Sequence, residues 1–193
     1  PVCLPIPEEK HPSGVNYTHS AAVAAEPKIA VVVPVYNGFS VLLDCVTSLL
    51  EYTPKEVRLL LIDDCSPDPR IGELFGQLKE RFAPRLETCR NETNLGFVRT
   101  VNRGFELAAG CDVIILNSDT VVSHRWSTLL KLAAYRSDAI GTVSAVSNNS
   151  NAFSVPIKGE NPLPPHQTLP QISRMYFQHA RNWGPEIHNG HGF

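Results

Sequence analysis

The chain has 193 residues, of which 42% are hydrophobic, so it can bury one substantial core but is short for two full domains. Its formal net charge is -2, from 17 basic and 19 acidic side chains, which argues against nucleic acid or an anionic membrane as a partner. A membrane span needs about 18 consecutive apolar residues, and the sequence has no such run.

The start of the chain differs in composition from the rest. Residues 1–27 are rich in proline and histidine without a sustained period, which predicts an N-terminal extension or linker, and residues 28–193 predict one domain. The first residue is Pro1 rather than Met, so we expect a piece of a longer polypeptide with other domains. The cysteines are odd in number and scattered, which favours reduced thiols and a cytoplasmic protein. They are Cys3, Cys45, Cys65, Cys89 and Cys111.

From Lys28 onward, continuous apolar runs alternate with apolar residues at helical spacing. Ser40 is available to cap the first helix, and Gly110 is expected to cap the third. In chain order we expect a strand at 29–33, a helix at 41–50, a strand at 57–63, a helix at 71–82, a strand at 86–90, a helix at 98–105, a strand at 113–116, a helix at 126–133, a strand at 140–146 and a short helix at 173–181.

This alternation predicts an α/β fold, with a mostly parallel sheet covered by helices on both faces and joined by right-handed crossovers. Ligands of such sheets bind beyond the carboxyl ends of the strands. After Val155 the pattern gives way to a proline-rich excursion.

Polar side chains follow the first, second and fourth expected strands. A carboxylate at the end of an apolar strand is costly to bury unless it is paired or bound, so Asp63, Asp64 and Asp119 indicate a ligand site. Helix capping is the alternative for any one of them taken alone. Their coincidence at one sheet edge favours the ligand.

Four motifs in this order resemble those of the inverting glycosyltransferases of family 2, which have the GT-A fold. They are residues 30–37 (AVVVPVYN), 61–66 (LIDDCS), 94–97 (NLGF) and 115–120 (ILNSDT). The last motif is similar to that of the rhamnosyltransferase-like branch. The resemblance covers residues 28–155, and it implies a nucleotide-sugar-binding domain that is truncated at its C-terminal side.

The resemblance implies contacts to the nucleoside of the donor. The turn after the first strand would wrap the nucleotide, so Val35, Tyr36 and Asn37 are expected donor-binding residues, with Val35 and Tyr36 flanking the base or ribose. Asp63 or Asp64 would accept a hydrogen bond from a pyrimidine N–H.

The resemblance also implies contacts to the diphosphate or sugar. Asn94 and Gly96 start the third helix, where free N–H groups and a small residue would bring the backbone close to the donor, and Asn102 would support that loop. The D-x-D motif of the family holds Mg²⁺ or Mn²⁺ between the phosphates. It reads Asn117-Ser118-Asp119 here, so Asp119 is the expected metal ligand and Asn117 and Ser118 are expected to contact the donor.

The resemblance predicts transfer of a sugar from a nucleoside diphosphate sugar to the hydroxyl of a glycan or lipid-linked acceptor, in polysaccharide or glycoconjugate synthesis. Inversion needs a general base. Glu160 and Glu186 fit an ordinary surface role better, so we expect the base beyond Phe193 and expect that this piece alone can be limited to donor binding. The parent protein would place the domain in the cytoplasm, at the inner face of the membrane.

A noncatalytic nucleotide-sugar-binding or interaction module of a larger polymer-synthesis protein is the alternative, motivated by Asn117 and by the absent base. A dinucleotide-binding oxidoreductase is excluded, because G-x-G-x-x-G is missing after the first strand. His179, His188 and His191 lack an acidic or Cys partner for a metal site. Tyr176 and Trp183 fit packing better than sugar stacking.

Overall fold

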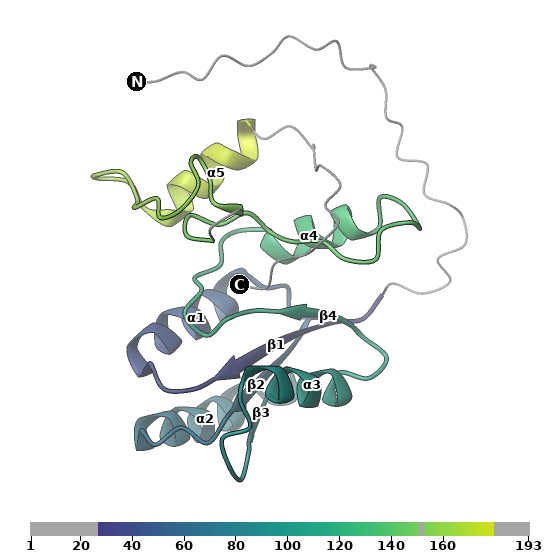
Figure 1. Ribbon diagram of the computed structural model, residues 1–193, viewed down its shortest axis with the longest axis vertical. Helices are drawn as coiled ribbons and strands as arrows, with labels where there is room; N and C mark the ends of the chain where they lie inside the picture. Colours follow the sequence, from purple (N-terminus) through teal and green to yellow (C-terminus); the bar gives the residue numbers. More distant parts are fainter. Residues whose placement is uncertain (1–26, 151–152, 180–193) are drawn as a thin grey trace.

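The computed structural model describes residues 27–150 and 153–179 (Figure 1). The expected linker therefore lies outside the described residues, apart from Pro27. Strands and helices alternate as the sequence predicts. In chain order they are β1 (Ile29–Val35), α1 (Phe39–Tyr52), β2 (Arg58–Asp63), α2 (Pro69–Phe82), β3 (Leu86–Arg90), α3 (Phe97–Leu107), β4 (Asp112–Ile115), α4 (Trp126–Ala134) and α5 (Leu169–His179).

The four strands form one parallel sheet in the order β3-β2-β1-β4. Val33 of β1 pairs with Leu61 of β2, and Val31 pairs with Ile114 of β4 on the other side. The chain first builds outward from β1 through β2 to β3, and then returns to place β4 beside β1. In open α/β sheets ligands bind where this order reverses, so the expected site lies at the carboxyl ends of β1 and β4.

Both faces of β1 are buried, which explains its unbroken apolar sequence. Val31, Val33 and Val35 point into a core shared with α1 and α2. Ala30 and Val32 point into a second core on the opposite face. The expected arrangement of helices on both faces of a parallel sheet is thereby confirmed.

Helix α3 lies on the face opposite α1 and α2, in front of the sheet in Figure 1. The connection from β3 to β4 runs in the reverse direction along the sheet, so a right-handed crossover requires this face. The helix approaches the sheet closely at Gly104, where an added Cβ would stand 2.3 Å from Val32 Cγ1. A glycine is therefore needed at this contact.

Two helix caps differ from the sequence prediction. Helix α1 begins at Phe39 after Gly38, which has a φ of 69°, so Ser40 lies inside the helix and does not cap it. The left-handed backbone at Gly38 turns the chain sharply out of β1, so the helix starts before Ser40 can serve as its cap. Helix α3 ends at Leu107 with Ala108 as its C-cap, and Gly110 lies in the following turn.

The expected strand at 140–146 is wrong, because these residues form no strand in the structure. The described residues that follow form isolated bridges, from Ser147 to Ser154 and from Asn149 to Glu160. None of residues 140–146 is buried and Val146 is 64% exposed, so the apolar pattern that suggested a strand is not buried against a neighbour. Strand formation depends on such packing.

Helix α5 begins at Leu169, before the expected residue 173, and the Gln171 side chain reaches back to Thr168. Gln171 Oε1 accepts a hydrogen bond from Thr168 N at 2.8 Å and fixes the first turn. Among residues 27–150 and 153–179, no helix has both the length and the apolar character needed to cross a lipid bilayer.

Candidate functional site

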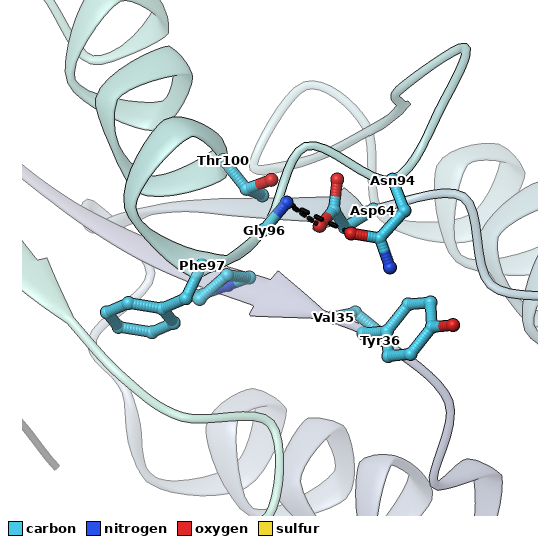
Figure 2. Close-up of a pocket in the computed structure, with 8 residues that line it drawn as sticks. Val35, Tyr36, Asp64, Asn94, Gly96, Phe97 and Thr100 are labelled. Carbon is cyan, nitrogen blue, oxygen red and sulfur yellow. Dashed lines mark hydrogen bonds between the residues drawn. The ribbon is translucent and has the colours of Figure 1, made fainter.

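Two pockets lie next to each other at the carboxyl edge of the sheet, each with a volume of about 320 Å³. They share Pro34, Tyr36 and Phe97, so these three residues form the boundary between them. The first pocket is also lined by Val35, Asp64, Asn94, Gly96 and Thr100 (Figure 2). The second is also lined by Asn37, Gly38, Val41, Asn117, Ser118 and Asp119.

Asp64 is the buried carboxylate of the first pocket and is 4% exposed. Its Oδ1 accepts hydrogen bonds from Asn91 Nδ2 at 2.7 Å and from Leu95 N at 2.8 Å, and its Oδ2 accepts one from Gly96 N at 2.8 Å. Burial alone would raise its pKa, but these bonds, together with the Thr100 hydroxyl, hold the pKa of Asp64 below its usual value. The carboxylate is therefore ionised at neutral pH.

The bonds to Asp64 alter the role expected for the start of α3. The N–H groups of Leu95 and Gly96 are donated to Asp64, so they are not free for a diphosphate. The Asn94 side chain also turns inward, and its Oδ1 accepts from Gly96 N at 3.0 Å. Figure 2 shows Asp64, Asn94 and Gly96 meeting above the end of β1. Asn94 and Gly96 line the first pocket, but the N–H groups of Leu95 and Gly96 are not among those free for a ligand.

Residues that the sequence analysis did not single out hold the Asp64 side chain in place. The Asn91 side chain is 1% exposed and donates both to Asp64 and to Thr100 Oγ1, the latter at 2.9 Å. Its own oxygen accepts a hydrogen bond from Arg103 of α3. An asparagine directly after the strand β3 is the signal that could have indicated this role.

Asp63 has a different environment from its neighbour. It is 1% exposed and lines neither of the two pockets. Arg90 at the end of β3 forms an ion pair with Asp63 Oδ2, and Ser66 N donates to Asp63 Oδ1 at 2.8 Å. Of the two expected carboxylates, Asp64 is the one that faces a pocket.

The second pocket contains the Asn117-Ser118-Asp119 segment that follows β4. Helix α1 holds this segment from behind, because Cys45 Sγ donates to Asn117 O at 3.7 Å and Ser48 Oγ accepts from Val122 N at 3.0 Å. Burial raises the pKa of the Cys45 thiol to about 12, and the nearby charge of Asp119 adds to this effect. A hydrogen bond from the Thr120 backbone lowers the pKa but does not offset the burial. Cys45 is thus a packing residue.

Asp119 itself is exposed at the second pocket. No ion pair involving it occurs within the described ranges, which also contain no cluster of three His, Cys, Asp or Glu side chains suited to a metal. One carboxylate beside an amide and a hydroxyl still fits Mg²⁺ or Mn²⁺ when phosphates complete the coordination. Such a cation would be shared between protein and ligand.

Other expected residues lie away from this edge or outside the description. Asn102 is exposed on α3 and lines neither pocket, and Glu160 is exposed in a loop. Tyr176 of α5 is 38% exposed. Phe97, which the sequence analysis passed over, borders both pockets. Outside the described residues or side chains lie His179, Trp183, Glu186, His188 and His191.

Comparison with solved structures identifies the class of this fold. A mannosyltransferase from Pyrobaculum calidifontis, in complex with GDP-Man and Mn²⁺, has a TM-score of 0.51 at 20% identity over 67% of this chain and 37% of its own. GalNAc-T7 with UDP, GalNAc and Mn²⁺ has a TM-score of 0.50 at 24% identity over 54% of this chain and 20% of its own. The fold is that of the GT-A glycosyltransferases.

Sequence comparison gives the family. The model of glycosyl transferase family 2 matches residues 30–193, and the chain belongs to this family. Glycosyltransferase GlyG of Streptococcus pneumoniae is 30% identical over 111 residues, which are 58% of this chain and 36% of GlyG. Human polypeptide N-acetylgalactosaminyltransferase 16 is 29% identical over 125 residues, 63% of this chain and 21% of the relative. The chain thus spans about a third or less of these two relatives.

Proposed function

We propose that this chain is the donor-binding part of a glycosyltransferase that moves a sugar from a nucleoside diphosphate sugar to the hydroxyl of a glycan or lipid-linked acceptor. The observation that supports this most is the pair of adjoining pockets, with Asp64 in the wall of one and Asp119 in the wall of the other. A nucleoside and its diphosphate need two such compartments, one with a hydrogen-bond acceptor and one that can hold a cation.

In this proposal the first pocket takes the base. The three N–H donors on Asp64 fill three of about four acceptor positions of a carboxylate. The acceptor position that remains suits the single N3–H of uracil or thymine. The Thr100 hydroxyl also donates to Asp64, and it can rotate away when a base binds. Guanine would present two adjacent N–H groups. Tyr36 is 52% exposed and can stack on the base.

The second pocket takes the diphosphate and the sugar. Asp119 would hold Mg²⁺ or Mn²⁺, with Asn117 and Ser118 offering neutral oxygens to the cation, its waters or the donor. When bound, the cation offsets the negative charge that develops on the departing nucleoside diphosphate. A single carboxylate makes this affinity lower than that of a site with two.

The finer features are parts of the same proposal. The N-S-D-T form of residues 117–120 favours the rhamnosyltransferase-like branch. The general base would come from the parent protein beyond Phe193, and the cytoplasmic location at the inner face of a membrane likewise concerns the parent protein. A noncatalytic module is the second candidate, because Asn117 stands where the family has a carboxylate. It is favoured if the next apolar segment of the parent sequence carries neither Asp nor Glu.

Calorimetry with UDP-, dTDP- and GDP-sugars tests the proposal. We expect the folded chain to bind UDP- or dTDP-sugars more tightly than GDP-sugars, and more tightly with Mn²⁺ than without. Asp119→Ala should remove the gain from Mn²⁺, whereas Asp44→Ala, at an exposed position of α1 outside both pockets, should keep it. Absence of binding to every donor by folded wild type would refute the proposal.

A further inference from the structure

We propose that Asp63 is a positioning residue which, through Ser66, fixes the turn at Asn37 that lines the second pocket. The inference rests on the proposed function, because it assigns the second pocket to the diphosphate. It gives the two adjacent carboxylates separate tasks: Asp64 acts at the first pocket, and Asp63 acts on the second without touching the ligand.

The first link consists of the hydrogen bonds that join Asp63 and Arg90 to the backbone of Ser66. Asp63 Oδ1 accepts from Ser66 N at 2.8 Å, and Asp63 Oδ2 is paired with the Arg90 guanidinium. The same guanidinium donates to Ser66 O at 2.8 Å. Both backbone groups of Ser66 are therefore tied to the Asp63–Arg90 ion pair, and Ser66 is 2% exposed. Charged partners make these hydrogen bonds stronger than neutral ones.

The second link runs from Ser66 to the turn after β1. Ser66 Oγ accepts from Asn37 N at 2.9 Å, and this bond joins residues 29 apart in sequence. Asn37 and Gly38 both have left-handed backbones, with φ values of 60° and 69°. Asparagine adopts this conformation more readily than most residues with a side chain, but the turn is held more firmly by an outside restraint on the Asn37 backbone. The Ser66 hydroxyl supplies it.

The third link is the place of this turn in the second pocket. Asn37 and Gly38 line the pocket together with Asp119, and neither lines the first pocket. The bonds on Asp64 come from Asn91 and the loop before α3, and Ser66 contributes none of them. Loss of the Ser66 hydroxyl should therefore disturb the diphosphate side and leave the base side intact.

The experiment compares uridine with UDP plus MnCl₂ as probes of the full chain, by ligand-observed NMR and calorimetry. For Ser66→Ala we expect the affinity for UDP with Mn²⁺ to fall about fivefold to tenfold, the effect of one lost hydrogen bond. Uridine affinity should stay within about twofold, because one unaltered pocket binds it. Ser154→Ala is the matched control: Ser154 is 8% exposed and its Oγ accepts from Ser150 N at 2.7 Å, outside both pockets.

Each outcome separates this inference from the proposed function. If wild type binds neither uridine nor UDP, the proposed function fails first. If wild type binds and Ser66→Ala binds UDP equally well, or loses uridine and UDP to the same extent, the positioning role is refuted. Should Ser66→Ala not fold, Arg90→Gln decides by the same comparison, because the Arg90 side chain is 47% exposed. Arg90→Lys, which keeps the charge beside Asp63, should lose less UDP affinity than Arg90→Gln.

Discussion

The substitution Asp64→Asn replaces one acceptor oxygen of a buried side chain by an N–H₂ donor of nearly the same shape. If the amide nitrogen took the place of Oδ1, it would face both Asn91 Nδ2 and Leu95 N. In the place of Oδ2 it would face Gly96 N, which keeps a second acceptor in Asn94 Oδ1. The second orientation is therefore favoured, at the cost of one hydrogen bond and of the charge, for a loss of about 1–3 kcal/mol in the free energy of unfolding.

The pH dependence of this loss follows from the lowered pKa of Asp64. A carboxylate with a folded-state pKa below its unfolded value, about 3.9, stabilises the protein above that pH. The stabilisation is lost as the pH falls through the folded-state pKa, where both states become protonated. The difference between wild type and Asp64→Asn should therefore be constant between about pH 5 and 7 and shrink below about pH 4.

Urea unfolding followed by circular dichroism, repeated across this pH range, measures the difference. Asp44→Asn serves as the control, because Asp44 is exposed on α1 and an exposed substitution should change stability by less than about 0.5 kcal/mol. Equal stability of Asp64→Asn and wild type at pH 7, or a difference that grows in acid, would refute the role given to the bonds on Asp64.

Two further predictions concern the close contact at Gly104 and the burial of Cys45. Gly104→Ala should lower the free energy of unfolding, because overpacking against Val32 costs about 1–3 kcal/mol and outweighs the gain in helix propensity. Gly76→Ala in α2 is the control, because nothing lies within 4 Å of the added Cβ; it should raise the free energy of unfolding by about 0.5–1 kcal/mol. Urea titrations in which both variants gain stability would contradict the close contact at Gly104. Iodoacetamide at pH 7.5 should alkylate the partly exposed Cys65 and leave Cys45 unmodified in the folded protein, because burial raises the pKa of Cys45 to about 12. Peptide mass spectrometry measures the alkylation. Alkylation of Cys45 at the rate of Cys65 would argue against its burial.

The strands and most helices could be predicted because their patterns report burial directly. β1 is apolar at every position since both of its faces are covered, and α2 shows its buried residues at helical spacing. The segment 140–146 also contains apolar residues but has no partner strand among residues 27–150 and 153–179, and sequence alone cannot supply that partner. The start of α5 was predictable in principle from Thr168 and Gln171, which have the spacing of a capping box.

The convergence of the residues after β1, β2 and β4 could be predicted from the sequence, because the carboxyl ends of parallel strands share one edge of the sheet. The different environments of Asp63 and Asp64 could not be predicted, since they depend on strand register. Asp63 lies opposite Arg90 in the pairing of β2 with β3, and this register creates the ion pair. Asp64, one residue later, is already beyond the sheet and meets the loop before α3.

A crystal structure of the chain with UDP and Mn²⁺ tests the two-pocket account most directly. The account predicts uracil beside Tyr36 with its N3–H donated to Asp64, and the diphosphate in the neighbouring pocket with the cation at Asp119. A nucleotide bound elsewhere on the molecule, or a diphosphate and cation that avoid Asp119, would contradict it.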